Sequence, residues 1–230
     1  MSIVFAFTIS IFNNDYSVES SKGKLMKRMD NLYENIYKPE NIMQAFDEVC
    51  RNMKNKKKVN AYKDFKCVYI SRIYNDLKYK NYKVGPYNEF TIYEPKERKI
   101  VSQGIYDKII NHLVARYILM PALIPKLIKQ NVASRENLGT RAGLGYHYRY
   151  MNLCKIKYGT FYILKFDISK FFASIDHEIL KRKLERHIKD KDALKIVFDI
   201  IDSVDAGLRN SVLWHHRYWQ YISLMILITL

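Results

Sequence analysis

Cysteine is scarce in this chain, and the few cysteines are far apart. Only three occur in 230 residues, Cys50, Cys67 and Cys154, and no two of them form a Cys-x-x-Cys pair. Small disulfide-stabilised domains and zinc ribbons need several cysteines at short spacing. The sequence therefore excludes both as the organising principle, and a reducing cytoplasmic compartment is the expected location.

Hydrophobic runs long enough to cross a membrane are also lacking. The chain is apolar at its two ends, over residues 1–12 and 221–230. Both stretches are shorter than the roughly 20 residues that a membrane-spanning helix needs. Residues 1–12 also lack the basic start and the small-residue cleavage site of a signal peptide. We expect no stable membrane association; the alternative is a protein that its apolar tail holds on a membrane.

Acidic residues are too few to balance the basic ones. The chain has 23 Asp and Glu against 39 Lys and Arg, which gives a formal net charge of +16. An excess of this size favours a polyanionic partner such as RNA or DNA and argues against an acidic binding surface. Since 48% of the residues are hydrophobic, the chain has enough apolar side chains to form a core, and wholesale disorder is not expected.

Hydrophobic periodicity predicts a mixture of helices and strands. A helix that Pro39 opens is expected to bury Ile42, Phe46 and Val49 on one face. Residues 90–101 predict a hairpin with a charged tip, and residues 161–167 predict a buried strand. The other helices are expected at 61–80, 107–119, 146–157, 177–187 and 192–201, with Pro121 and Pro125 ending the helix at 107–119.

The segment Lys165-Phe-Asp-Ile-Ser-Lys-Phe-Phe-Ala-Ser-Ile-Asp-His177 carries the strongest chemical signal. In it, an apolar strand ends on Asp167, and a tight turn with two adjacent aromatic residues follows. A carboxylate at a strand end projects from a rigid frame, and Mg²⁺ prefers such oxygen ligands, which it shares with substrate phosphates. Asp167 is therefore the candidate metal ligand; the alternative is that it only ends the strand or caps the turn.

This segment resembles the first catalytic motif of bacterial reverse transcriptases of the group II intron, retron and diversity-generating type. Glu94-Pro-Lys-Glu-Arg-Lys-Ile100 resembles the fingers motif of the same family. Asn131-Val-Ala-Ser-Arg-Glu-Asn-Leu-Gly-Thr-Arg-Ala-Gly143 resembles the segment that follows the fingers motif. The three motifs stand in the family's order, and an ordered set is far more specific than any one of them.

The resemblance implies an α+β fold, in which right-hand polymerase fingers and a partial palm follow a helical N-terminal extension. Gly85-Pro86 interrupts the helical pattern and marks the first boundary. The implied parts are a basic helical extension over 1–85, fingers over 86–160, a partial palm with the first catalytic motif over 161–208 and a divergent apolar tail over 209–230.

The resemblance also assigns roles to individual residues. In the family, two Mg²⁺ ions activate the primer 3′-hydroxyl and stabilise the leaving pyrophosphate. The Asp167 carboxylate and the Ile168 backbone carbonyl would be metal ligands. The implied partners are an RNA template, a DNA primer and a dNTP. The implied dNTP-binding residues are Lys96, Arg98, Ile168, Lys170, Phe171 and Phe172, and the implied contacts to template phosphates are Arg135 and Arg141.

Within the dNTP-binding set, each residue has a distinct implied task. Arg98 would neutralise the triphosphate, and the backbone amides of Lys170 and Phe171 would cradle it. Phe172 would be the ring that excludes a ribose 2′-hydroxyl. The alternative for the two phenylalanines is ordinary packing, and for Arg98 it is a solvated hairpin tip.

Three further titratable residues are expected to have structural roles. Asp176 stands before His-Glu-Ile and is the predicted N-cap of a helix rather than a partner of Asp167. Asp107 and His112 are five residues apart, so they do not share the helix face that a metal-binding pair needs. A cap and an exposed ring are expected there instead.

No Asp-Asp dipeptide occurs anywhere in the chain. In the resembling family a later Tyr-x-Asp-Asp hairpin supplies the second catalytic carboxylate. After Gly207-Leu208 the sequence departs from the family's pattern, and from residue 206 to 230 it has no Asp, Glu or Lys. We therefore expect an amino-terminal piece of a reverse transcriptase that is catalytically incomplete by itself. The alternative function is that of a non-catalytic, maturase-like RNA-binding protein.

Overall fold

The computed structural model describes residues 28–53, 55–93, 97–127, 131–132, 135, 138–163 and 175–203. They fall into two compact units. The larger unit contains the described residues of 28–127 and 175–203, and the smaller unit contains those of 131–163. Residues 164–174, which include most of the predicted catalytic segment 165–177, lie outside the described residues, as does the chain from residue 204 onward.

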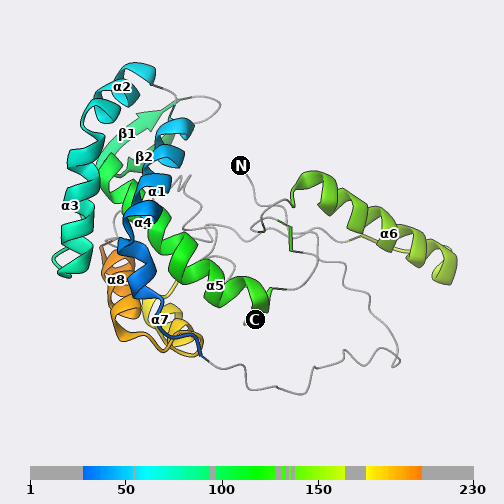
Figure 1. Ribbon diagram of the computed structural model, residues 1–230. Helices are drawn as coiled ribbons and strands as arrows, with labels where there is room; N and C mark the ends of the chain where they lie inside the picture. The colour runs from blue at the N-terminus through cyan, green and yellow to red at the C-terminus, as the bar shows by residue number, and fades with distance from the viewer. Residues whose placement is uncertain are drawn as a thin grey trace. The chain divides into compact units, whose positions relative to one another are not determined.

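Helices dominate the larger unit, and one small antiparallel sheet accompanies them (Figure 1). The predicted α+β class is right in this coarse form, while polymerase fingers, a palm and the domain boundaries stay predictions. The strands are β1 (Asn88–Ile92) and β2 (Arg98–Ser102). The helices are η1 (Tyr33–Tyr37), α1 (Pro39–Asn52), α2 (Lys56–Asp64), α3 (Lys66–Lys78), α4 (Ile105–Val114), η2 (Ala115–Leu119), α5 (Met120–Leu123), η3 (Ile124–Lys126), α7 (His177–Glu185) and α8 (Lys191–Asp202).

Helix α1 forms as its sequence predicts. Pro39 occupies the first turn, where its missing amide hydrogen has no helical partner to lose. Ile42, Phe46 and Val49 recur at helical spacing, and all three are buried. Their face packs against α3 and α4 (Figure 1). The core of the larger unit therefore joins residues from both sides of Gly85.

The single helix predicted over 61–80 is wrong, because the structure has two helices that meet at Phe65. The Asn55 side chain caps α2 by accepting a hydrogen bond from the Lys58 amide. Phe65 is 60% exposed and Val68 is 63% exposed, whereas Ile73 is fully buried. At 100° per residue, Val68 lies on the side of α3 opposite the buried Ile73, so one helix face could not bury both residues.

The prediction that Pro121 ends a helix is also wrong. Helix α4 continues through a π-helical turn, η2, into α5. At the end of that turn the Met120 amide bonds to the Ala115 carbonyl, five residues back. Proline has no amide hydrogen to donate in a regular helix, and the altered bonding directly before Pro121 lets the helical path continue. Side chains of this path form the centre of the core, among them Ile109, Ile110, Leu113, Val114 and Ile118.

The predicted hairpin and the predicted last two helices are confirmed. β1 and β2 pair antiparallel, with Phe90 opposite Ile100. α7 and α8 pack against each other. In the smaller unit, α6 (Thr140–Tyr158) begins earlier than expected and ends at Gly159, whose φ of 68° suits a residue without a side chain.

Asp190 holds the two ends of the larger unit together. Its Oδ1 accepts a hydrogen bond from the Ala193 amide, which caps α8. Its Oδ2 accepts the amides of Leu32 and Tyr33, each at 2.8 Å. Beside it, the Met29 amide donates to the His187 carbonyl, and the Lys189 amide donates to the Met29 carbonyl. Segments almost 160 residues apart in sequence are thus joined through backbone groups.

Glu48 of α1 contacts two basic side chains of the neighbouring helical path, His112 and Arg116. Its Oε2 lies 2.7 Å from His112 Nε2, and its Oε1 accepts a hydrogen bond from Arg116 Nη1 at 2.6 Å. A carboxylate only accepts, so His112 Nε2 carries the shared hydrogen. The expectation of an exposed His112 ring is therefore wrong: its side chain is 11% exposed and faces Glu48. Burial acts to raise the pKa of Glu48, but the hydrogen bonds from Arg116 and His112 outweigh it and lower that pKa.

Replacing Asp190 tests whether its carboxylate holds the two ends of the larger unit together. We expect Asp190→Ala to lower the free energy of unfolding by roughly 2–4 kcal/mol, because it removes a cap and leaves two amides without their acceptor. Asp190→Asn keeps one oxygen and should lose about half as much. Urea denaturation measures both, with Asp199→Ala on the exposed side of α8 as the control, expected within about 0.5 kcal/mol of the parent. Equal losses at positions 190 and 199 would contradict the assignment.

Protonation of Glu48 should lower the free energy of unfolding at acidic pH. Its folded-state pKa lies below the ordinary value of 4.5, so the stabilisation is complete above that pH and is lost as the pH falls through the folded-state pKa. Glu48→Gln should therefore flatten the fall in unfolding free energy between about pH 5 and pH 3. Glu89→Gln, at an exposed position of β1, is the control. If both variants keep the parent's slope, the ion pairs of Glu48 do not contribute.

Candidate nucleic-acid and nucleotide interface

Most of the predicted dNTP- and metal-binding residues cannot be placed. Asp167, Ile168, Lys170, Phe171 and Phe172 lie outside the described residues, and so does Lys96 at the hairpin tip. Over the described residues, no group of three or more His, Cys, Asp and Glu side chains could hold a metal ion. The carboxylate of Asp167 and the carbonyl of Ile168 are oxygen donors that suit Mg²⁺, and the magnesium site stays a prediction.

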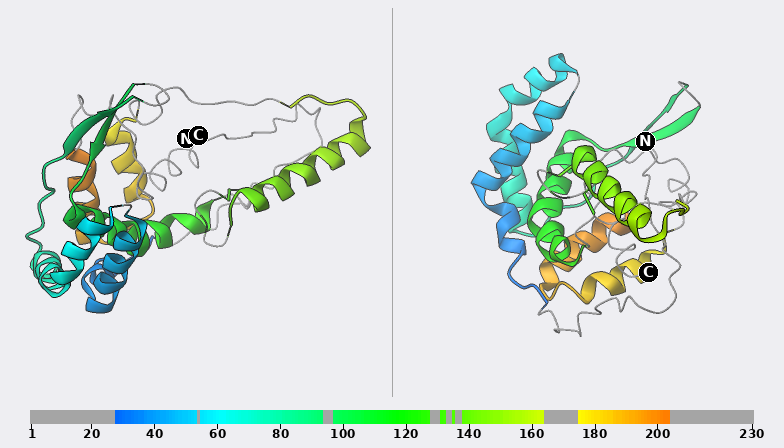
Figure 2. Two further views of the ribbon diagram at one scale, coloured as in Figure 1. Left: turned by 90° about the horizontal axis from the view of Figure 1, so that it is seen from above. Right: turned by 90° about the vertical axis from the view of Figure 1, so that its right-hand side faces the viewer.

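Arg98 is located by the register of the hairpin. It is the first residue of β2 and pairs with Ile92, the last residue of β1. This pair is the end of the ladder nearest the turn. The backbone of Arg98 is therefore at the far end of the hairpin, which extends away from the helices of the larger unit (Figure 2).

Two aromatic side chains near this end of the hairpin are exposed. Tyr93, directly after β1, is 72% exposed, and Phe90 is 50% exposed. Exposed rings beside basic residues are typical of surfaces on which nucleic-acid bases stack. The pattern of residues 90–101 predicts a hairpin but gives no sign that these two rings are exposed.

Arg141 and Arg135 belong to the smaller unit. Arg141 is exposed in the first turn of α6, and Arg135 is half-buried in the segment before it. Helix α6 contains no acidic residue, and none of its residues is buried. Its Tyr148 is 62% exposed. The basic residues of α6 besides Arg141 are Arg149, Lys155 and Lys157.

The start of α7 follows directly on the predicted catalytic segment. Asp176 caps this helix, because its Oδ1 accepts the amide of Ile179 at 2.9 Å. The prediction of a cap is confirmed. The hydrogen bond from the Ile179 amide favours the ionised carboxylate and lowers the pKa of Asp176. The predicted catalytic segment thus ends at a fixed helix start.

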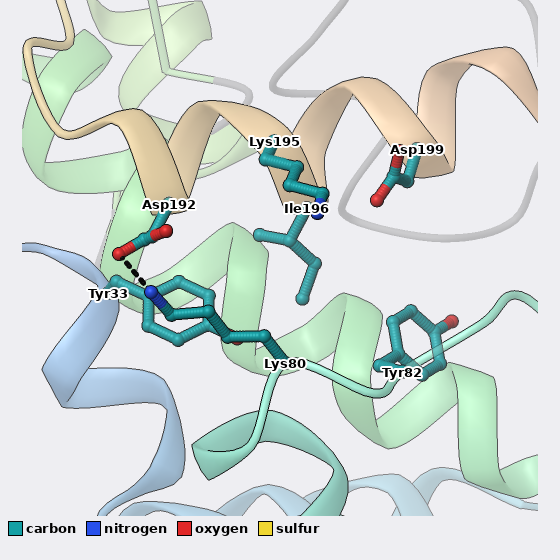
Figure 3. Close-up of a pocket in the computed structure, with 7 residues that line it drawn as sticks. All are labelled: Tyr33, Lys80, Tyr82, Asp192, Lys195, Ile196 and Asp199. Atoms are coloured by element: carbon teal, nitrogen blue, oxygen red, sulfur yellow. Dashed lines mark hydrogen bonds and ion pairs between the residues drawn. The ribbon is translucent and has the colours of Figure 1, made fainter.

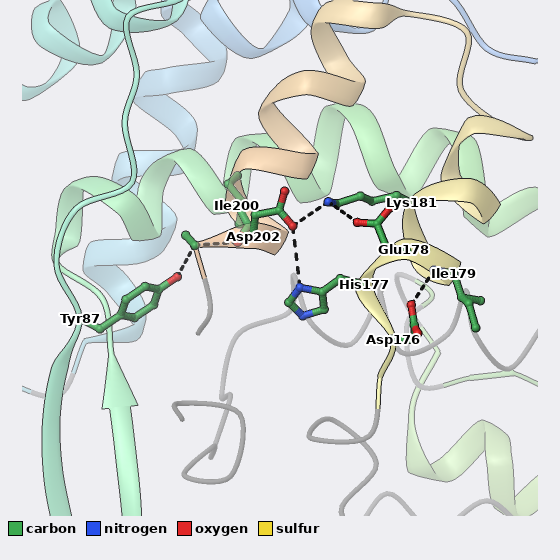
Figure 4. Close-up of polar contacts among 9 residues, drawn as sticks. Tyr87, Asp176, His177, Glu178, Ile179, Lys181, Ile200 and Asp202 are labelled. Carbon is green, nitrogen blue, oxygen red and sulfur yellow. Dashed lines mark hydrogen bonds and ion pairs between the residues drawn. The ribbon is translucent and has the colours of Figure 1, made fainter. Parts of the chain in front are cut away.

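An ionic cluster joins the start of α7 to the end of α8 (Figure 4). Lys181 Nζ lies 2.8 Å from Asp202 Oδ1 and 2.9 Å from Glu178 Oε1. His177 Nδ1 lies 3.8 Å from the same Asp202 oxygen. Hydrogen bonds to Asp202 and Glu178 raise the pKa of Lys181. The cluster orients the end of α8, and its carboxylates are already engaged by cations.

A hollow in the larger unit lies between α8, η1 and the segment after α3 (Figure 3). Its volume is about 20 Å³, which is room for roughly one water molecule. Lys80 spans it and lies 2.6 Å from Asp192. The hollow is too small for a nucleotide. Its lining residues are Tyr33, Lys80, Tyr82, Asp192, Lys195, Ile196 and Asp199.

Asp107 is not the helix cap that was expected. It is 5% exposed, and its Oδ1 accepts hydrogen bonds from the Tyr82 hydroxyl and the Gly85 amide. A Cβ at Gly85 would lie 2.8 Å from Asp107 Oδ2, so glycine is required for this close approach. Gly85 therefore anchors the start of the hairpin segment to α4. An acid between the apolar residues Ile105 and Ile109 was the available signal for this contact.

None of the described helices combines the length and the apolar character needed to cross a bilayer. Comparison of the chain with known protein families and with curated proteins finds no match.

Proposed function

We propose that this chain is the fingers and first palm portion of a reverse transcriptase-like protein, which binds RNA but does not polymerise by itself. In the proposed parent activity, two Mg²⁺ ions support template-directed addition of dNTPs to a DNA primer. Arg98 would contact the triphosphate, and Arg135 and Arg141 would contact template phosphates. Asp167 would be the metal-binding carboxylate.

The observation that carries this proposal is the order of three motifs along the chain. They occur at residues 94–100, 131–143 and 165–177. Local structure is compatible with this order: a β-hairpin brackets the first motif, a helix begins within the second, and a capped helix follows the third.

Surface chemistry gives the proposal separate support. The net charge of +16 favours a polyanion. The far end of the hairpin and helix α6 each combine basic residues with exposed aromatic rings. Single-stranded nucleic acids bind to surfaces of this kind through phosphate contacts and base stacking.

RNA binding should depend strongly on salt. If the two phosphates assigned to Arg135 and Arg141 are contacted, the affinity for single-stranded RNA should fall about sevenfold between 50 and 200 mM salt. Fluorescence anisotropy with a labelled oligonucleotide measures how steeply the affinity depends on salt. Substituting Arg135 or Arg141 with Gln should each reduce this slope by about 0.7.

The control for these variants is Arg51→Gln, the same substitution at an exposed position in the last turn of α1. It should leave the slope near the parent value. Affinity that does not change with salt, or equal effects at positions 51 and 141, would remove the proposed role of these arginines.

Primer extension tests the catalytic part of the proposal. The 230 residues contain no Asp-Asp dipeptide to supply the second carboxylate, so no product is expected from an RNA template, a DNA primer, dNTPs and Mg²⁺. Template-directed product that disappears in Asp167→Asn would show that the chain completes a metal site in another way. Salt-sensitive RNA binding with no extension fits the proposal and equally fits the maturase-like alternative. The two readings differ in dNTP binding, because only a polymerase ancestry requires it. A dNTP affinity that Arg98→Gln weakens would therefore support the reverse transcriptase reading over the maturase-like one.

A further inference from the structure

Four polar side chains form a hydrogen-bonded chain that none of the roles above uses. Asn111 Nδ2 donates to Gln103 Oε1. Gln103 Nε2 donates to Tyr87 Oη at 3.2 Å, and Tyr87 Oη lies 2.7 Å from Ser203 Oγ (Figure 4). Ser203 Oγ in turn donates to the Ile200 carbonyl at 2.7 Å. The chain runs from α4, past the base of the hairpin, to the end of α8.

In this hydrogen-bond network each side chain donates to the next, from Asn111 through Gln103, Tyr87 and Ser203 to the Ile200 carbonyl. A hydroxyl has a single hydrogen, and that of Ser203 is directed to Ile200. The hydrogen between Tyr87 and Ser203 must therefore come from Tyr87. The tyrosine oxygen is left as the acceptor for Gln103, as observed. The acceptor at the end is a carbonyl in the last turn of α8, where helical carbonyls lack amide partners.

Because this hydrogen-bond network is largely buried, breaking any of its links is costly. Gln103 is 8% exposed and Asn111 is 1% exposed. A buried amide that loses its partner keeps the full desolvation penalty, so breaking one link destabilises more than the link itself contributes. Asn111 Oδ1 already lacks a hydrogen-bond partner, which leaves the network little tolerance for a second orphaned group.

Tyr87 and Gln103 stand at the two sides of the hairpin base. The first pair of the ladder at the base of the hairpin is Asn88 opposite Ser102. Tyr87 directly precedes Asn88, and Gln103 directly follows Ser102. Five residues of β-strand are about 17 Å long, so a tilt of about 10° at the base would move the Arg98 end by about 3 Å. A fixed base is therefore needed for a precisely placed tip.

We propose that Tyr87 is a positioning residue, whose hydroxyl fixes the β1–β2 hairpin to the end of α8 and thereby sets the place of Arg98. The same α8 end is held on its other side by the contacts of Asp202 with Lys181 and His177 (Figure 4). The consequence for Arg98 rests on the proposed function, whereas the attachment of the hairpin does not.

Hydrogen exchange measured by mass spectrometry on the full chain tests the attachment. In Tyr87→Phe, peptides that cover residues 88–102 should exchange about fivefold faster, as expected when one hydrogen bond no longer opposes local opening. Peptides of α1 and α3 should keep the parent rates. Tyr93→Phe, which removes an exposed hydroxyl from the same hairpin, should change neither.

Ser203→Ala removes the acceptor at the other end of the same link. It should accelerate hydrogen exchange in the hairpin as Tyr87→Phe does. The double variant should exchange little faster than either single variant. This second variant carries the test if Tyr87→Phe does not fold. Unchanged hairpin exchange, or equal acceleration in α1 and the hairpin, would overturn the proposal, since the latter is the signature of a purely global loss of stability.

Affinity for dNTP separates this inference from the proposed function. Arg98→Gln should weaken dNTP binding severalfold in the parent and less in the Tyr87→Phe background. If Arg98→Gln has no effect in the parent, the proposed role of Arg98 fails, while the exchange result still decides whether Tyr87 holds the hairpin. If its effect is the same in both backgrounds, Tyr87 does not position Arg98.

Discussion

The carboxylate of Asp190 binds backbone groups from both ends of the larger unit, and the arrangement of that unit depends on it. One oxygen caps α8, and the other holds the amides of Leu32 and Tyr33. Because these amides belong to the N-cap and the first residue of η1, they have no helical carbonyl of their own to bind. A single acid thus satisfies both a helix start and a chain segment that begins almost 160 residues earlier. The helices between them can then enclose one core.

Once α8 is held at its start, its far end becomes a fixed point for the hairpin. Asp202 is bound from α7, and Ser203 is bound by Tyr87. The hairpin is also attached through Gly85, whose amide binds the buried Asp107 of α4. Hydrogen bonds are short-ranged and directional, so they can fix the orientation of the hairpin base. Apolar packing is not directional and allows small rotations at little cost in free energy. Tyr93, directly after β1, is exposed, and the base of the hairpin is anchored by polar contacts.

This combination fits the proposed binding of RNA. Basic and aromatic residues at the far end of the hairpin can meet a polyanion, and a fixed base limits the entropy lost when they do. Helix α6 has the same mixture of cations and exposed rings, without an acidic residue to oppose a phosphate. Sequence-independent phosphate contacts of this kind would serve a polymerase fragment or a maturase-like protein equally well. The carboxylates near α7 and α8 are instead engaged in ion pairs with Lys181 and His177.

The sequence by itself determined the elements with a strong local signal: Pro39 and the spacing of Ile42, Phe46 and Val49 in α1, the hairpin around residues 94–96, and the Asp176 cap. Such signals act over a few residues, so they survive in any tertiary context. Only the tertiary structure decided that α2 and α3 separate at Phe65, that a helix passes Pro121, and that Asp107 and His112 are buried. It also decided the partners of Asp190 and Tyr87, because a hydrogen bond between residues more than 100 positions apart leaves no local pattern in the sequence.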